Sequence, residues 1–307
     1  MQHETSILRH IFDNTEDAKK KKLGIPTRIP KLHAYGTAGG TPYILMQMKD
    51  GNLEKLREEC EEERLRKNEK TKEKKSKEDG EKVQLIPPID AFFIGQEAVI
   101  AMKECHSYSI VHRDIKPTNL ILGVDDEKAW YLCDFGDACP IGDTKLLSPP
   151  DAFTLPYLSR TAHLAVRKPT KATISMDIES WFYVFIELFT ELPWKGELDE
   201  ESVLSAKKSF WESLGSERNL LSELPSEVMK ISKIVANTSL ENPYSALTAI
   251  LRDGFKKENA KHSPWKPFWK EERPKTEAKP SAEEQKESVA VENKNKNSKA
   301  NRSVSKG

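Results

Sequence analysis

The sequence predicts an α+β fold, with a small N-terminal region of one helix and two strands followed by a larger, mainly helical region. Two observations lead to this prediction. Runs typical of β-strands are confined to residues 31–48 and 120–133, whereas apolar residues recur at helical spacing through most of the chain between residues 91 and 257. A chain of 307 residues is also long enough to bury a sizeable core.

The N-terminal region is predicted to begin with a helix over residues 2–12. Four of its residues share one helical face, namely Glu4, Ile7, Leu8 and Ile11. Two β-type runs follow at Lys31–Thr37 and Thr41–Met48, and the Gly39-Gly40 pair between them is typical of a hairpin turn.

Two segments are dominated by charged and polar residues. Residues 54–82 are almost entirely Glu, Lys and Arg, and such a run cannot bury enough apolar area to offset its ordering entropy except as a solvated helix. We interpret it as an insertion in a helical connection without a catalytic role. Residues 271–307 contain mainly Lys, Glu, Ser, Asn and Pro without periodicity, which predicts a disordered tail.

A small hairpin is predicted in the middle of the chain. A helix from about Ala91 to Ser107 leads into a polar loop, and two short strands follow at Leu120–Leu122 and Ala129–Cys133. The Asp125-Asp126 pair would form the turn between these strands. The polar residues that flank the hairpin, Asn119 and Asp134, should therefore lie near each other.

The most apolar helix is predicted from Ile178 to Thr190. Its apolar residues point in most directions around the axis, which indicates a position at the centre of the larger region. Asp177 at its start is interpreted as an N-cap, worth about 1 kcal/mol. Further helices are predicted at Ser202–Leu214, Glu223–Asn237 and Ser245–Lys257.

One motif dominates the functional interpretation. It is the run Val111-His112-Arg113-Asp114-Ile115-Lys116-Pro117-Thr118-Asn119-Leu120, followed by Cys133-Asp134-Phe135-Gly136. Singly, its polar residues would be interpreted as turn formers or solvated charges. The first element alone has a chance expectation of roughly one in 10⁵ at average residue frequencies. The two elements together therefore indicate a catalytic site.

The residue types suit phosphoryl transfer, in which a protein mainly positions groups and neutralises charge. Asp114 would accept the proton of a substrate hydroxyl, and Lys116 would place its ammonium against the transferring phosphate. Asn119 and Asp134 would hold Mg²⁺ through oxygen atoms. The remaining motif residues are given supporting roles: His112 packs the loop, Phe135 packs inward, and Gly136 frees the backbone to turn.

Composition limits the classes of partner and compartment. Lys plus Arg and Asp plus Glu both total 49, so no global charge favours nucleic acid or a membrane as a partner. Four cysteines without CxxC spacing are typical of reduced thiols in the cytoplasm or nucleus. The N-terminus lacks the apolar segment of a secretory signal, and no apolar run is long enough to span a bilayer.

These residues resemble the protein kinases, and are most similar to the casein kinase 1 group, especially its tau-tubulin kinase-like branch. The resemblance covers roughly residues 2–270. Besides the catalytic motif it is carried by Tyr157-Leu158-Ser159, His163-Leu164, Asp177-Ile178-Glu179-Ser180-Trp181, Glu191-Leu192-Pro193-Trp194 and Pro267-Phe268-Trp269.

The resemblance implies a two-lobed fold, with a truncated small β lobe in residues 1–49 and a large helical lobe in residues 50–270. It implies ATP and Mg²⁺ as cofactors and proteins with Ser or Thr as substrates. It also assigns further residues: Met46 at the back of the adenine pocket, Met48 in the hinge, Asp177 as a brace of the catalytic loop, Arg113 as structural support, and Glu4 as the glutamate that pairs with a phosphate-binding lysine. Independently of the resemblance, an arginine such as Arg113 is able to receive a phosphorylated loop residue.

Three departures from the family's pattern leave alternatives open. No GxGxxG loop occurs, no lysine precedes Lys19, and only three residues precede Glu4. The first hypothesis is a Ser/Thr kinase with Asp114 as base. The second is a pseudokinase or scaffold that docks a protein through its helical lobe and charged insertion. The third is that the polypeptide in the cell is longer. Between Gly136 and Ser159 the only basic residue is Lys145, so a preference for phosphorylated substrates is not implied.

Overall fold

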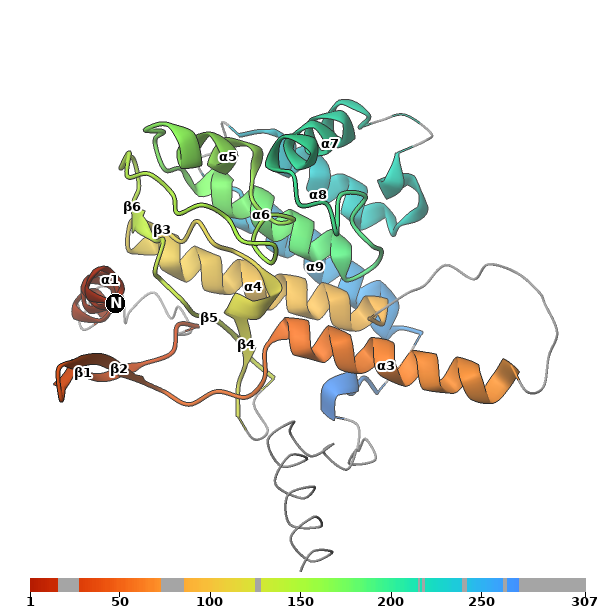
Figure 1. Ribbon diagram of the computed structural model, residues 1–307. Helices are drawn as coiled ribbons and strands as arrows, with labels where there is room; N and C mark the ends of the chain where they lie inside the picture. The colour runs from red at the N-terminus through yellow and green to blue at the C-terminus, as the bar shows by residue number, and fades with distance from the viewer. Residues whose placement is uncertain are drawn as a thin grey trace, which may run out of the picture. The chain divides into compact units, whose positions relative to one another are not determined.

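The computed structural model describes residues 1–15, 28–72, 86–124, 128–214, 216, 219–238, 242–261 and 264–270. Residues 1–269 form one compact unit. Figure 1 shows its elements in chain order: α1 (Gln2–Thr15), β1 (Leu32–Ala38), β2 (Thr41–Met46), α3 (Leu53–Lys72), α4 (Pro88–Ser107), β3 (Ile110–Val111), η1 (Pro117–Asn119), β4 (Leu120–Leu122), β5 (Trp130–Leu132), β6 (Cys139–Pro140), α5 (Arg160–Arg167), α6 (Ile174–Glu187), α7 (Glu200–Glu212), η2 (Leu220–Glu223), α8 (Ser226–Ala236), α9 (Tyr244–Asn259) and η3 (Phe268–Lys270).

The small N-terminal region is α1 with the β1–β2 hairpin, as the sequence predicts. The two strands pair antiparallel, and Gly39 and Gly40 form the turn with φ values of 57° and 83°, which only glycine adopts readily. Leu8 and Ile11 of α1 are buried in the core. The strands of the described residues form three separate two-stranded sheets, and everything else of regular structure is helical. The predicted α+β class is confirmed.

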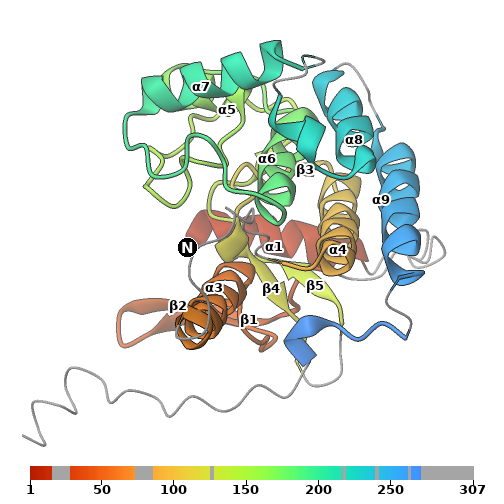
Figure 2. The ribbon, with the colours of Figure 1, turned by 90° about the vertical axis from the view of Figure 1, so that its right-hand side faces the viewer.

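The larger region is built around α4, which lies beside α9 in both views (Figures 1 and 2) and also contacts α6. The close approach of these helices depends on a glycine, Gly95 of α4, which has no side chain. A Cβ atom added at Gly95 of α4 would lie 2.6 Å from the Phe185 ring on α6 and 3.3 Å from Leu251 on α9. Phe185 and Leu251 are fully buried, so neither can move aside without disturbing the core.

We therefore expect Gly95→Ala to destabilise the fold by roughly 1–3 kcal/mol, the usual cost of overpacking a core. The greater helix propensity of alanine, worth about 1 kcal/mol, opposes this loss but does not exceed it. Urea unfolding measures the change. Gly51→Ala is the matched control, because a Cβ there would meet only the flexible Lys55 side chain at 3.8 Å. A Gly95→Ala midpoint equal to that of the wild type would contradict the packing argument.

The central helix α6 differs from its prediction at both ends. It begins at Ile174, so Asp177 lies within the first turn and is not the N-cap. The capping position belongs to Thr173, whose side chain makes no cap hydrogen bond. The N-cap interpretation is wrong because the carboxylate of Asp177 is used by a distant loop, described below. The burial prediction is confirmed, since every residue from Met176 to Glu187 is buried.

None of the described helices combines the length and apolarity needed to cross a bilayer.

The charged segment is helical as far as Lys72, and its first turns pack against the core. Leu53, Leu56 and Arg57 are buried, and the Arg57 guanidinium forms an ion pair of 2.9 Å with Glu187 of α6. This helix, α3, is therefore anchored at its start. Residues 73–82 of the predicted insertion, the Asp125-Asp126 turn and the predicted tail of residues 271–307 lie outside the described residues.

Arg28, which precedes β1, is attached to α4 and β5. The carbonyl of Arg28 accepts from the Leu132 amide at 2.8 Å, and the Arg28 guanidinium forms an ion pair of 3.0 Å with Glu97. The Arg28 amide donates to the carboxylate of Glu104, which is buried. Burial raises the pKa of Glu104 to about 7, against the opposing effect of the bond from Arg28.

This shift predicts a pH dependence of stability. The folded pKa of Glu104 is raised, so its contribution to stability is fully present below about 4.5 and is lost as pH rises through about 7. The loss across this window is roughly 3 kcal/mol. Urea unfolding of Glu104→Gln between pH 4.5 and 7 should show a flatter profile than the wild type. If the unfolding free energies of the two proteins differ by the same amount at pH 4.5 and at pH 7, Glu104 is not the source of the pH dependence.

Candidate active site

The catalytic motif lies in the loop after β3, and the carboxylate of Asp177 fixes its backbone. Asp177 accepts from the amides of His112 and Arg113, both at 2.7 Å, and is itself fully buried. Burial alone would raise the pKa of Asp177, but hydrogen bonds from His106 and the His112 amide outweigh it and leave that pKa lowered. Arg113 has a φ of 66°, a rare conformation for a residue with a side chain. Asp177 thus holds the loop in a strained turn.

His112 connects this loop to the segment that bears Asp134. Its ring is fully buried and packs edge-on against Phe135, with 4.8 Å between ring centroids. Its Nε2 atom lies 3.0 Å from the carbonyl oxygen of Cys133. Phe135 is itself fully buried. The arrangement gives His112 and Phe135 a packing role.

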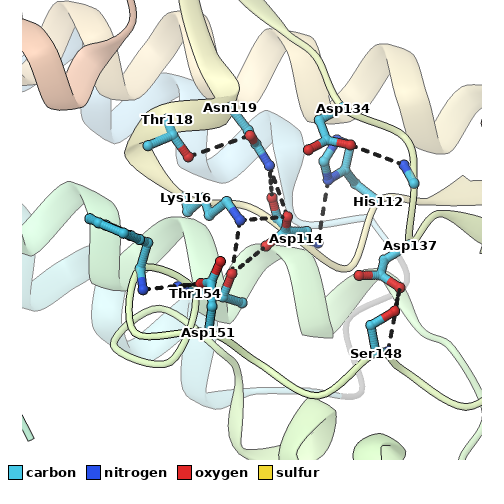
Figure 3. A network of polar contacts seen from close by, with 12 residues as sticks. His112, Asp114, Lys116, Thr118, Asn119, Asp134, Asp137, Ser148, Asp151 and Thr154 are labelled. Carbon is cyan, nitrogen blue, oxygen red and sulfur yellow. Dashed lines mark hydrogen bonds and ion pairs between the residues drawn. The ribbon is translucent and has the colours of Figure 1, made fainter. Parts of the chain in front are cut away.

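Asp114 lies at the centre of a polar network (Figure 3). Its Oδ2 atom is 2.9 Å from the Lys116 ammonium and accepts from the Asn119 amide nitrogen at 3.0 Å. The same nitrogen donates to the backbone carbonyl of Asp114 at 2.9 Å. Asn119 is thereby oriented so that its amide nitrogen faces Asp114.

The predicted metal ligands are brought together by the β4–β5 hairpin. The Cys133 amide donates to the Asn119 carbonyl at 3.0 Å, so Asp134 follows directly after the residue that pairs with Asn119. Asp134 is exposed, has a φ of 66°, and accepts from the Gly136 amide at 3.3 Å. Amide and carboxylate oxygens at this position suit Mg²⁺, which prefers oxygen ligands and retains several waters.

Glu4 of α1 adds negative charge to the same region. Its carboxylate accepts a hydrogen bond from the Phe135 amide, and its pKa is raised by burial and then by the charge of Asp134. A divalent cation would relieve this repulsion, so the residues present fit a bound Mg²⁺. Among the described residues no lysine or arginine forms an ion pair with Glu4.

Burial and the charges of Asp134, Glu4 and Asp114 raise the pKa of the Cys133 thiol to about 12.

Thr154 is a site residue that the sequence prediction missed. Its hydroxyl accepts from the Lys116 ammonium at 2.8 Å and donates to Asp114 Oδ1 at 3.3 Å, as Figure 3 shows. Asp151 closes the turn before it by accepting from the Thr154 amide at 2.7 Å. Thr154 is forty residues from Asp114, and no local pattern distinguishes it from other threonines of the chain.

The residues predicted to contact the adenine ring lie at the end of β2. Met46 is half-buried and packs against the core, whereas the side chain of Met48 is 77% exposed. The segment that follows pairs with β4, because the Asp50 amide donates to the Leu122 carbonyl at 2.9 Å. The Lys49 ammonium lies over the Tyr131 ring at 3.2 Å. The predicted hinge therefore runs beside the hairpin that carries Asn119.

The side chain of Arg113 faces the segment after Asp134. Its Nε donates to the Asp137 carbonyl at 2.7 Å and its Nη1 to the Lys145 carbonyl at 2.6 Å. The remaining nitrogen, Nη2, is buried and has no hydrogen-bond partner among the described residues. Arg113 thus supports the backbone of residues 137–145 and retains one nitrogen, Nη2, without a partner among the described residues.

Comparison with known proteins gives a consistent result. The profile of the protein kinase domain family matches residues 44–256, which is more than half of the chain. The chain is 29% identical over 166 residues to a probable serine/threonine-protein kinase, PknB, of Lactococcus lactis, covering 53% of this chain and 25% of that protein. It is 25% identical over 173 residues to a probable serine/threonine-protein kinase of Dictyostelium discoideum, covering 53% and 33% respectively.

A third relative is the casein kinase 1-like protein HD16 of Oryza sativa, 35% identical over 130 residues, which cover 38% of this chain and 18% of that protein. The chain thus spans between about a fifth and a third of the length of these relatives. The match to the protein kinase family, over residues 44–256, contains every element from β3 to α8 in full. It therefore includes the loop of Asp114, the β4–β5 hairpin and Asp177.

Proposed function

We propose, from the premise that this chain belongs to the protein kinase family, that it transfers the γ-phosphate of ATP to Ser or Thr hydroxyls of proteins. The family's two-lobed fold is present, with few strands in the small lobe and a mainly helical large lobe. The observation that carries the proposal is the convergence of Asp114, Lys116, Asn119 and Asp134 from two loops joined by the Asn119–Cys133 backbone bond.

In this mechanism Asp114 is the base. Its Oδ1 atom accepts a hydrogen bond from the Thr154 hydroxyl, so the same carboxylate can accept the proton of a substrate hydroxyl placed beside it. Lys116 and the Asn119 amide hold the other carboxylate oxygen, which fixes the direction in which Oδ1 points. This preorganisation reduces the reorganisation needed during transfer.

Binding of the nucleotide would use the residues predicted to hold Mg²⁺ and to border the adenine ring. Bound Mg²⁺ supplies positive charge that neutralises the phosphates. Asp134 and the side-chain oxygen of Asn119 would hold it, and Met46 and Met48 would border the adenine ring. Glu4 contributes negative charge next to Asp134 and would strengthen the attraction for the cation.

A nucleotide-binding measurement tests this part of the proposal. Isothermal titration with Mg²⁺ and ATP should show binding to the wild-type chain that weakens roughly tenfold, about 1.4 kcal/mol, in Asp134→Asn, because one ionic ligand is lost. Asp143→Asn is the matched control, since Asp143 is exposed and its carboxylate accepts from the nearby Lys145 amide. Equal affinity of all three proteins, or no binding by any, would count against the proposal.

The finer assignment to the casein kinase 1 type rests on the motif residues quoted above and on the rice relative. Transfer of phosphate to casein by the wild-type chain would support kinase activity. Nucleotide binding without transfer to any protein would favour a pseudokinase or scaffold that docks a partner, for which the helix α3 offers a charged surface.

The four cysteines are free thiols, which supports a cytoplasmic or nuclear location.

A further inference from the structure

A short segment after Thr154 is held in place by side chains far along the chain. This segment, residues 155–158, is called here the anchor segment. The Trp194 indole donates to the Pro156 carbonyl at 2.8 Å, and the Tyr157 hydroxyl donates to Glu187 at 2.5 Å. Thr154, which touches Asp114 and Lys116, directly precedes the anchor segment. The position of the Thr154 hydroxyl therefore depends on how firmly the anchor segment is held.

Lys207 of α7 makes the most direct contacts with the backbone of the anchor segment. Its side chain is fully buried, and its ammonium donates to the carbonyls of Leu155 at 2.9 Å and Leu158 at 2.6 Å. Its third contact is with His163 Nε2 at 3.3 Å. An ammonium has three N–H donors, so all three find acceptors here.

The surroundings of Lys207 are consistent with a charged, fully paired group. His163 Nδ1 lies 3.2 Å from the Glu200 carboxylate, and burial followed by the charge of Lys207 lowers the pKa of His163 to about 4. The neutral imidazole can then donate to Glu200 through Nδ1 and accept from Lys207 through Nε2. The ammonium also lies 5.1 Å from the centre of the Tyr183 ring and 5.8 Å from that of Trp194.

We propose that Lys207 is a positioning residue that pins both ends of the anchor segment and thereby sets the Thr154 hydroxyl against Asp114 and Lys116. The inference rests on the proposed function for its catalytic consequence, but the positioning itself is a property of the fold. Losing the ammonium would release the carbonyls of Leu155 and Leu158 at once, while Trp194 would still hold Pro156.

Hydrogen exchange measures how often the anchor segment opens, and it does not require enzymatic turnover. The reporters are amides that bond within the turn: Leu155 to the Asp151 carbonyl at 2.9 Å, and Tyr157 and Leu158 to the Thr154 carbonyl at 3.0 and 3.1 Å. In the full chain with Lys207→Met at pH 6.5, these amides should exchange about tenfold faster than in the wild type. Lys208→Met is the matched control, because Lys208 is exposed on the same helix.

Unfolding by urea separates a local from a global effect. Lys207→Met leaves the buried carbonyls of Leu155 and Leu158 without their donor, so its urea midpoint should fall, but the anchor segment should open more than this global loss explains. Exchange that accelerates equally throughout the described core would overturn the proposal, as would unchanged exchange of the three reporters. If Lys207→Met does not fold, Lys207→Gln, which keeps donor groups without the charge, is measured in the same way.

The pH dependence of exchange gives a second readout. Burial lowers the pKa of Lys207 to about 7, against the raising effects of Glu179 and Glu200. The other charged or titratable groups that face it are His163 on α5 and Tyr183 on α6. After correction for the intrinsic rate, reporter exchange in the wild type should accelerate as pH rises from 6 to 8, because the neutral amine donates less strongly. Lys207→Met should show no such change.

Kinetics connect the positioning to catalysis. Lys207→Met should lower kcat/KM for a protein substrate about tenfold and leave the Kd for Mg²⁺ and ATP unchanged, since its contacts lie on the side of Thr154. Altered nucleotide affinity with unaltered exchange would overturn the proposal. A wild-type chain that transfers no phosphate counts against the proposed function alone, because the exchange experiment still decides the role of Lys207.

Discussion

Replacing Asp114 by asparagine is expected to lower phosphoryl transfer to a protein substrate by about 10²–10⁴-fold, the usual contribution of general acid–base catalysis. The asparagine amide cannot accept the substrate proton. It would also place an uncharged group against the Lys116 ammonium, which now lies 2.9 Å from the Asp114 carboxylate with both side chains largely buried. Nucleotide binding should change less than transfer, because the backbone carbonyl of Asp114 would still accept from the Asn119 amide at 2.9 Å and keep this predicted metal ligand oriented.

Initial rates of phosphate transfer to casein measure this effect, with nucleotide affinity determined separately by calorimetry. Asp143→Asn again serves as the control for a charge removed from the surface nearby. An Asp114→Asn protein that retains the wild-type rate would show that another group accepts the proton. A joint loss of rate and nucleotide affinity would show that Asp114 acts mainly in binding, contrary to the proposed mechanism.

The largest expected change in stability comes from Asp177→Ala. This substitution leaves the amides of His112 and Arg113 and the ring of His106 without their shared acceptor in the core. Uncompensated buried partners of this kind commonly cost 3–5 kcal/mol, so we expect a loss of roughly that size. The φ of 66° at Arg113 would also lose the contact that maintains it.

Urea unfolding measures the global loss, and hydrogen exchange at His112 and Arg113 measures the release of the catalytic loop. The control is Glu191→Gln, an exposed acidic residue that follows the same helix. Because the pKa of Asp177 is lowered, its stabilisation is present above about pH 4 and is lost as pH falls through the folded pKa. A loss below 1 kcal/mol at pH 7 would contradict the role assigned to this carboxylate.

Local patterns predicted most of the elements and the contents of the catalytic motif. The face of Glu4, Ile7, Leu8 and Ile11 predicted α1, and the glycine pair predicted the hairpin turn, because helix and turn preferences act over a few residues. The spacing between Asn119 and Asp134 anticipated that a short hairpin would bring them together. The Asn119–Cys133 backbone bond is the contact that does so.

Contacts between distant residues were beyond the reach of such patterns. Asp177 at the start of an apolar run resembled an N-cap, although its partners lie 64 and 65 residues earlier in the chain. Thr154 is placed by a turn whose position only the fold determines. Lys207 offered one overlooked signal: it falls at i+4 from Val203 and i−3 from Phe210, both buried, so a lysine occupies the apolar face of α7.

The thiol of Cys133, next to Asp134, bears on the design of covalent ligands. With a pKa of about 12, roughly one molecule in 10⁵ would carry the reactive anion at pH 7, against roughly one in 30 for an ordinary cysteine. An electrophilic inhibitor that docks beside this sulfur should therefore react slowly. Its selectivity would have to come from reversible affinity. A compound that places a positive charge between Asp134 and Glu4 would bind there and would also lower the pKa of the thiol, which makes the sulfur more reactive.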